Sequence, residues 1–309
     1  MNIFISGSLA YDRIMDFPGR FADHILPDKI HVLNVCFNIN GLVEKFGGTA
    51  GNIAYSLAVL GESPCIVATC GEDFARYEKW LAQNKLPLSY IKPVSGVLTA
   101  GAYITTDLDD NQITAFNPGA MAFEAELPAL DSSSVVFIGP GNKTDMMNLA
   151  ENARLAGAPF FFDPGQSLNI WNGDELREAV WGALCFISND YELSLFLRMT
   201  GWTMSDLHDA VEVVITTRGS EGAVIEEGGE KSLIPAVPAD QVIDPTGAGD
   251  TFRAGVLKAV SMGLPWEVAC RMGATAASFS VAHYGTQEHR FGWEEFCQRY
   301  EKSYGPFEG

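Results

Sequence analysis

The sequence has 309 residues, of which 47% are hydrophobic, and its formal net charge is -19. This length and apolar content are typical of a globular protein with one large α/β domain or two smaller ones. The negative charge argues against binding to nucleic acid or to anionic membrane surfaces, which carry the same sign of charge, but it does not exclude a nucleotide held by local donors.

Cysteine usage and the N-terminus indicate a cytoplasmic protein. The six cysteines form no CxxC pair and lie mostly in apolar runs, which favours buried thiols over a disulfide scaffold or a zinc site. The first seven residues have no basic region before their apolar run, so they predict a strand and not a signal peptide. No apolar run approaches the ~18 residues that a membrane helix needs.

Short apolar runs alternate with helical patterns along the chain. In chain order, the patterns predict a strand at 3–6, a helix at 51–60, a strand at 65–69, a helix at 74–83, a strand at 135–138, a helix at 143–156, strands at 159–163 and 184–188, a helix at 190–199 and a strand at 213–217. This rhythm predicts a mostly parallel sheet with helices on both faces, whose ligands bind beyond the carboxyl ends of the strands.

Two segments interrupt this rhythm. Residues 11–46 contain no clear long helix, and residues 90–118 contain a hairpin pattern with strands at 99–106 and 112–116 around a turn rich in Asp and Asn. We interpret both as insertions that build a small β lid; the alternative is a pair of ordinary surface excursions. Because the chain has no repeat, low-complexity tract or linker, we expect a single domain over 1–309.

The segment Asp244-Pro245-Thr246-Gly247-Ala248-Gly249-Asp250-Thr251-Phe252 is the most informative. A helix is predicted to begin near Ala248, so the glycines would let a phosphate approach free backbone N–H groups. A carboxylate at that point, Asp250, can accept the proton of an attacking hydroxyl group. The alternative is a plain turn with a first-turn helix acid. A Walker A loop is excluded because Asp250 stands where Lys is needed, and a dinucleotide fingerprint because Phe252 replaces its third glycine.

Other polar loops follow the predicted strands. Asp12 follows the first strand, and the glycine-rich turn at 46–54 carries Asn52 at a helix start, where it can bind a ligand or cap the helix. Asn189 and Glu192 open the helix at 190–199 and fit either a magnesium site or a capping box. The glycines of the loop at 216–222 suit a nucleotide or a β-turn, and the loop at 163–165 suits a strand-end turn.

These residues together resemble the PfkB, or ribokinase-like, family of ATP-dependent kinases over nearly the whole chain. The segment 244–252 is similar to the C-terminal signature of the family, Gly47-Gly48 with Asn52-Ile53-Ala54 and Leu60-Gly61 to its N-terminal signature, and Asn189-x-x-Glu192 to its NxxE motif. The resemblance implies a Rossmann-like core with a β lid.

The resemblance also implies a role for each site residue. Asp250 would be the general base, and Gly247, Ala248 and Gly249 the anion hole for the transferred phosphoryl group. Substrate hydroxyl groups would be held by Asp12, Gly47, Gly48 and Asn52. The nucleotide side would comprise Asn189 and Glu192, which would organise Mg²⁺ through water, together with Thr217, Gly219 and Gly222. The segment 274–283 would flank the adenine of ATP.

For the acceptor, the resemblance favours adenosine. Thr49 stands where sugar kinases of the family tend to have a basic residue, and the turn at 47–52 with the segment 105–116 is similar to bacterial adenosine kinases. Tyr11, Phe37 and Phe116 can stack on a purine or pack in the core. A ribose-like sugar, inosine or guanosine as acceptor, and a non-catalytic nucleoside-binding protein, are the alternatives.

The role of Arg253, the binding of a monovalent cation and the oligomeric state each have more than one interpretation. Arg253 differs from the small or apolar residue frequent at its position in the family, and it can contact the substrate, contact phosphate or cover Asp250. A monovalent cation such as K⁺ would bind near Asp244 and the segment 284–286. The protein can be a monomer or a homodimer formed through its lids.

Overall fold

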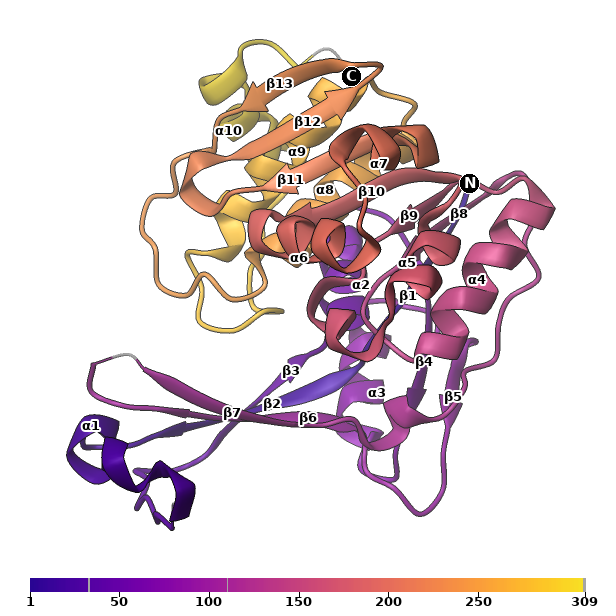
Figure 1. Ribbon diagram of the computed structural model, residues 1–309. Coiled ribbons are helices and arrows are strands. Elements are labelled where there is room, and N and C mark those ends of the chain that lie inside the picture. The colour runs from indigo at the N-terminus through magenta and orange to yellow at the C-terminus, as the bar shows by residue number, and fades with distance from the viewer. Residues whose placement is uncertain (33, 110, 308–309) are drawn as a thin grey trace.

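The computed structural model of the protein describes residues 1–32, 34–109 and 111–307, so positions 33 and 110 of the predicted insertions lie outside the described residues. The chain forms a large nine-stranded sheet with helices on both faces and a separate four-stranded sheet (Figure 1). This architecture confirms the predicted fold class. Among the described helices, none combines the length and the apolar character needed to cross a membrane.

The large sheet contains all six strands that the hydrophobic pattern predicts. In order across the sheet it consists of β13 (Glu230–Ile234), β12 (Ala223–Glu227), β11 (Val211–Thr217), β10 (Ala183–Asn189), β9 (Phe160–Phe162), β8 (Ser134–Ile138), β1 (Asn2–Ser6), β4 (Cys65–Cys70) and β5 (Ile91–Pro93). The strands from β5 to β11 are parallel, whereas β12 and β13 form an antiparallel edge. The turn between β12 and β13 is Gly228-Gly229, both with positive φ, as a two-residue hairpin turn requires.

Helices cover both faces of this sheet because its strands are apolar on both sides. Along β1, Ile3 and Ile5 belong to one core and Phe4 to the other. The first core is closed by α2 (Thr49–Val59), α3 (Ala75–Gln83), α8 (Ala248–Ser261), α9 (Trp266–Ser280) and α10 (Trp293–Tyr304). The second is closed by α4 (Lys143–Ala156), α5 (Gly173–Val180), α6 (Asp190–Thr200) and α7 (Met204–Ala210).

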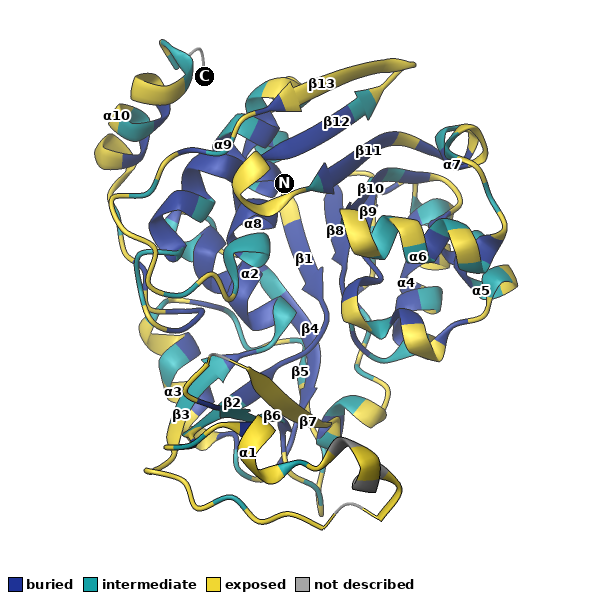
Figure 2. Ribbon diagram, turned by 60° about the vertical axis from the view of Figure 1, so that its left-hand side comes forward, coloured by how far each residue is buried: buried dark blue, intermediate teal, exposed yellow. Residues whose placement is uncertain are grey.

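The small sheet is built from both insertions and projects away from the core (Figure 1). Its order is β3 (Val43–Gly47), β2 (Ala10–Asp16), β6 (Ala100–Thr106) and β7 (Gln112–Asn117), and the short α1 (Phe21–His24) lies in the first insertion. The predicted hairpin is confirmed as β6 and β7. Every residue of β7 is exposed (Figure 2). In the second insertion, β5 pairs instead with β4 at the edge of the large sheet.

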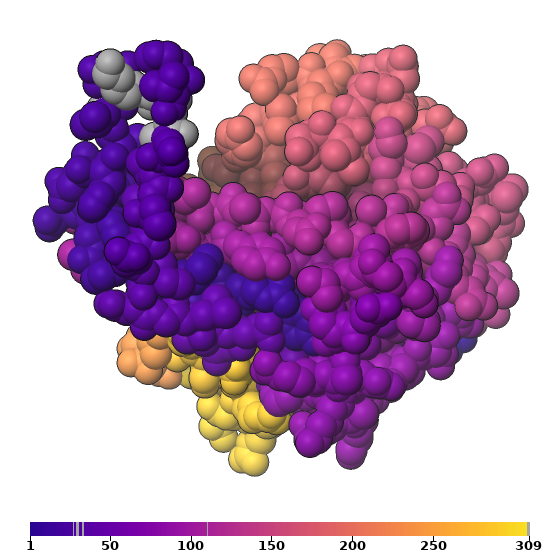
Figure 3. Space-filling view, turned by 90° about the horizontal axis from the view of Figure 1, so that it is seen from below, coloured from indigo at the N-terminus to yellow at the C-terminus, as the bar shows by residue number. Residues whose placement is uncertain are grey.

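The strand order reverses beside β1. The chain adds β4 on one side of β1 and then β8, β9, β10 and β11 in succession on the other. The loops after strands β8 to β11 therefore open at one edge of the sheet, where α/β proteins of this kind bind ligands. Viewed from below, the molecule is deeply notched between the indigo N-terminal lobe and its pink and orange part (Figure 3).

Candidate active site

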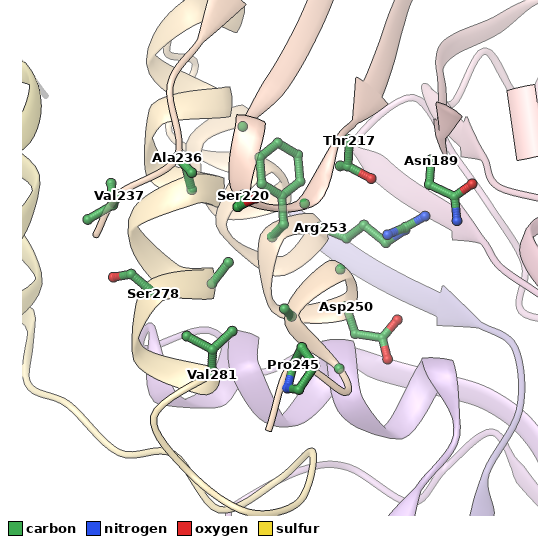
Figure 4. Close-up of a pocket in the computed structure, with 18 of the residues that line it drawn as sticks. Asn189, Thr217, Ser220, Ala236, Val237, Pro245, Asp250, Arg253, Ser278 and Val281 are labelled. Atoms are coloured by element: carbon green, nitrogen blue, oxygen red, sulfur yellow. The ribbon is translucent and has the colours of Figure 1, made fainter. Parts of the chain in front are cut away.

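A cavity of about 710 Å³ lies at this edge of the large sheet. Residues that follow four successive parallel strands line it: Pro140 after β8, Asp163 after β9, Asn189 at the end of β10 and Thr217 at the end of β11. The first turn of α8 forms the floor, and α9 with the segment after β13 supplies apolar walls (Figure 4). This volume is in the range of small-molecule sites in proteins.

The first turn of α8 presents free backbone donors to the cavity. Gly247 precedes the helix in the left-handed conformation, with φ of 78°, and a Cβ there would lie 2.9 Å from Thr286. Within the described part of the chain, the N–H groups of Gly249 and Asp250 find no acceptor. Such orphan N–H groups, together with the helix dipole, favour an anion at this end.

Asp250 lies in this first turn and points into the cavity (Figure 4). Burial is the main reason that its pKa is raised, and the charge of Glu192 adds to that effect. The Arg253 guanidinium and a hydrogen bond from Asn52 Nδ2, at 2.7 Å, act in the opposite direction by favouring the carboxylate. A partly desolvated carboxylate is thereby placed beside an anion-binding helix start.

The orientation of the Asn52 amide is fixed by other side chains. Its Oδ1 accepts hydrogen bonds from Thr286 Oγ1 at 2.8 Å and from Gln287 Nε2 at 3.0 Å. Gln287 also donates to the Tyr77 hydroxyl, and its Oε1 accepts from Trp80 Nε1. Since Oδ1 is occupied, Nδ2 must face Asp250, and only its second hydrogen is left for a ligand.

Asp12 approaches Asp250 from the small sheet. It lies on β2 and packs over Gly47, where a Cβ would lie 2.2 Å from its Oδ2 atom. Gly48 has φ of 88°, and a Cβ there would meet Ser8 O at 2.6 Å. Burial and the negative charges of Asp250 and Asp244 raise the pKa of Asp12 to about 6. These residues form a second group beside Asp250, outside the lining of the cavity.

Asn189 and Glu192 form a capping box at the start of α6. Glu192 N donates to Asn189 Oδ1 at 2.7 Å, and Asn189 N donates to Glu192 Oε2 at 2.9 Å. Both side chains also line the cavity. Burial and the charge of Asp163 raise the pKa of Glu192. The cap therefore holds one oxygen of Glu192 and leaves the amide of Asn189 facing the cavity.

The other residues predicted for the nucleotide side also line the cavity. Thr217, Gly219 and Gly222 line it, and both glycines have positive φ, of 56° and 93°. A Cβ on Gly222 would lie 2.0 Å from Ile234 O, so glycine is required for the close approach of the chain leaving β13. Residues of the segment predicted to flank adenine also line the wall, namely Ala274, Ala277, Ser278 and Val281.

Arg253 forms a buried ion pair with Asp163. Its Nε donates to Asp163 Oδ2 at 2.5 Å, and the two side chains are 9% and 2% exposed. Burial raises the pKa of Asp163, and Arg253 opposes this rise. No sequence pattern indicated this pairing, because Asp163 was interpretable as part of a plain strand-end turn. The structure instead brings Asp163, Glu192, Asp250 and Arg253 to one cavity.

Of the aromatic candidates, Tyr11 is buried and donates to Asp73 O, whereas Phe37 packs on Phe17 and Phe21. Phe116 is 50% exposed on β7. Sequence patterns did not indicate Gln287, Tyr77 or Trp80, since the polar run 286–290 has no recognisable pattern, and they indicated Thr286 only within the segment named for a monovalent cation. The two segments named for a monovalent cation do meet, because Asp244 Oδ2 accepts from Gly285 N at 3.0 Å.

Comparison with known proteins adds independent information. The model of the family described as pfkB family carbohydrate kinase matches residues 21–290. The nucleoside kinase of Methanocaldococcus jannaschii is 32% identical over 278 residues, which cover 89% of this chain and 92% of the relative. Its crystal structure matches with a TM-score of 0.89 at 30% identity and covers 98% of this chain and 99% of the other.

Two further relatives carry names that differ in the acceptor. A nucleoside kinase of Burkholderia thailandensis in complex with inosine matches with a TM-score of 0.86 at 38% identity, covering 98% of both chains. The cytidine kinase of Thermococcus kodakarensis is 28% identical over 282 residues, which cover 85% of this chain and 97% of the relative.

Proposed function

Because the chain belongs to the pfkB family of carbohydrate kinases, whose members phosphorylate a hydroxyl group of a nucleoside or sugar, we propose that it is an ATP-dependent nucleoside kinase with adenosine as its acceptor. The products would be AMP and ADP. One observation carries the proposal: Asp250 stands between the cavity and the acceptor side formed by Asp12 and Asn52, beside unpaired backbone N–H groups.

In this proposal each side of Asp250 holds one substrate. The nucleotide fills the cavity, with its terminal phosphoryl group at the unpaired N–H groups in the first turn of α8 and its base between α9 and the segment after β13. The nucleoside ribose binds Asp12 and the free hydrogen of Asn52. Asp250 then accepts the proton of the 5′-hydroxyl as this oxygen attacks the phosphoryl group, while the helix N-terminus stabilises the developing charge.

The residues present fit a magnesium ion that arrives with the nucleotide. Among the described residues, no three His, Cys, Asp or Glu side chains are grouped to hold a metal by themselves. Magnesium commonly binds through a few carboxylates, water and substrate phosphates, and Glu192 and Asn189 line the cavity, where they would organise such an ion through water. When bound, the ion would neutralise phosphate charge.

The residues near the acceptor favour an uncharged nucleoside but do not distinguish its base. Thr49 supplies no cation for a phosphorylated sugar, which favours an uncharged nucleoside. Inosine is the second candidate, because the Burkholderia thailandensis relative binds it. The hydroxyl ligands on the acceptor side, Asp12 and Asn52, suit the ribose of any nucleoside, so the base must decide between these candidates.

The test is ADP release with a panel of acceptors: adenosine, inosine, guanosine, cytidine, ribose and fructose. We expect adenosine to give the highest kcat/KM and 5′-deoxyadenosine, which lacks the attacked hydroxyl group, to give none. A preference for inosine would correct the acceptor and keep the nucleoside kinase, and turnover of ribose alone would make the protein a sugar kinase. Absence of acceptor-dependent ADP release across the whole panel would refute the proposal.

A further inference from the structure

The cavity contains a single positive side chain. Among the described residues that line it, Arg253 is the only lysine or arginine, whereas Asp163, Glu192 and Asp250 are carboxylates. A polyphosphate in this cavity needs donors that carry positive charge, and arginine provides the geometry that phosphate oxygens accept best. The Arg253 N–H groups that do not bind Asp163 are therefore the positively charged donors that such a polyphosphate would use.

Most donors of Arg253 are unused. A guanidinium has five N–H groups, and only Nε has an acceptor among the described residues, Asp163 Oδ2. The side chain is nevertheless 9% exposed. The terminal nitrogens are not among the fully buried side-chain atoms of the described residues that lack a partner, so they border the open volume of the cavity, where an anionic ligand can supply the missing oxygens.

These unused donors lie over the first turn of α8. A Cβ on Gly249 would lie 2.9 Å from Arg253 Nη1, so glycine makes room for the guanidinium beside the backbone donors. In Figure 4 the Arg253 side chain extends from α8 between Asp250 and Asn189, toward the interior of the cavity. The charge of Asp250 acts on Arg253 as well. The guanidinium and the helix N-terminus thus face the same volume.

Asp163 determines the direction of this guanidinium. It lies at the end of β9, it is 2% exposed, and its second oxygen, Oδ1, has no partner among the described residues. Because it binds Nε, it restricts the orientation of the guanidinium, whose Nη1 lies beside Gly249. An ion pair buried only for stability gains little over apolar residues of the same volume, so its retention at this place calls for another reason.

We propose that Arg253 binds the phosphoryl group that is transferred, through its terminal N–H groups above the first turn of α8, and that Asp163 is the residue that positions it. This inference rests on the proposed kinase function. It assigns to a side chain part of the charge stabilisation that backbone donors would otherwise provide alone. No bond to Arg253 or Asp163 forms or breaks, and the proton of the acceptor still passes to Asp250.

The test uses the double variant Asp163→Asn/Arg253→Met, because removing Arg253 alone would leave a buried carboxylate unpaired and would threaten folding. We expect the Kd for ATP to rise about 10-fold or more while that for ADP, which lacks the transferred group, stays within about twofold. Turnover should fall about 100-fold or more, the usual effect of losing a donor to a transition-state oxyanion. Thermal unfolding checks that the variant is folded.

The matched control is Glu267→Gln/Arg271→Met, which removes an ion pair on α9 outside the cavity and should change neither binding nor turnover. Asp163→Asn alone should lower kcat and leave the KM for the nucleoside unchanged, and Arg253→Lys should recover part of the ATP affinity that the double variant loses.

Equal losses of ATP and ADP affinity, or wild-type turnover in a folded double variant, would overturn the inference. If the wild type phosphorylates a nucleoside but the double variant loses neither ATP affinity nor turnover, the proposed function stands and this inference fails. If the wild type phosphorylates nothing in the panel, the ATP and ADP affinities still decide whether Arg253 contacts the terminal phosphate. If the wild type does not bind ATP, both fail.

Discussion

At the scale of single residues, Asp250 is the proposed base, and two opposing influences act on its charge. Burial and Glu192 disfavour its charge, whereas Arg253 and the Asn52 hydrogen bond favour it. A carboxylate with a raised pKa is a better proton acceptor than a solvated one, provided that it is ionised at the working pH. Glu192, Arg253 and Asn52 therefore influence the charge state of the one group that would accept the proton.

The first prediction concerns this base. Asp250→Asn keeps the shape of the side chain and removes its ability to accept a proton, so we expect kcat to fall by about 10²–10⁴-fold. The Kd for adenosine, measured by calorimetry, should change little. Asp174→Asn serves as a control, since Asp174 is exposed and pairs with Arg177 on α5 outside the cavity. Retention of near-normal turnover in Asp250→Asn would remove Asp250 from the role of base.

The second prediction concerns Asp12, whose pKa is raised to about 6 by burial and by the charges of Asp250 and Asp244. Above pH 6 the side chain is ionised and accepts two hydroxyl hydrogen bonds, and below pH 6 it is protonated and loses acceptor capacity. The Kd for the nucleoside should therefore rise as the pH falls from 7 to 5. In Asp12→Asn this pH dependence should disappear, and a Kd independent of pH in the wild type would contradict the assignment.

At the scale of elements, the start of α8 depends on segments that are distant in sequence. The loop 283–290 reaches α2 through Thr286 and Gln287, whose hydrogen bonds hold the Asn52 amide against Asp250. The same loop contacts the small sheet, because Thr286 Oγ1 donates to Phe46 O and Lys45 pairs with Glu288. One loop thus connects the base, the acceptor side and the β3 strand.

The third prediction tests this connection with Gln287→Met. The change leaves buried polar partners, Asn52 Oδ1 and Trp80 Nε1, without one hydrogen bond each, so the free energy of unfolding should fall by about 1–3 kcal/mol. Because the Asn52 amide is then less constrained, kcat should also fall. Denaturant unfolding and initial rates measure the two effects. The exposed Gln298→Met on α10 is the control and should change neither; an equal, small effect of both variants would exclude the network from the site.

At the scale of the whole molecule, charge and shape set the conditions for binding. The chain carries a net charge of -19, and three carboxylates face the cavity against one arginine. Asp12 lies on the small sheet and Asp250 on the core, so the two substrates of the proposed reaction would bind at the junction of the two parts (Figure 1). A movement of the small sheet over the nucleoside would exclude water from the transfer, which is the expected role of a lid.

The fourth prediction follows from this charge balance. Removal of divalent cations with EDTA should abolish turnover and weaken ATP binding, because Arg253 alone cannot balance the charge of the phosphates together with that of Asp163, Glu192 and Asp250. Excess Mg²⁺ should restore both. Adenosine binding, which involves the acceptor side, should not respond to EDTA and provides the control. Full turnover in EDTA would contradict a metal-assisted transfer.

The sequence by itself determined the fold class, the six parallel strands and the loops that carry Asp250, Asn189 and Thr217 to one edge, because hydrophobic periodicity and glycine placement are local properties of the chain. It did not reveal the β12–β13 edge, although Gly228-Gly229 is a recognisable hairpin signal.

Only the tertiary structure decided the partners of the site residues. Asn52 contacts Asp250 across 198 positions of sequence, and Arg253 contacts Asp163 across 90. Such contacts depend on the order of strands in the sheet and on the packing of α8 against α2, which no local pattern encodes. The capping box of Asn189 and Glu192 was readable from their spacing, but their place in the cavity beside Asp163 was not. Chemistry-bearing residue types are a property of the sequence, whereas their charge environment is a property of the fold.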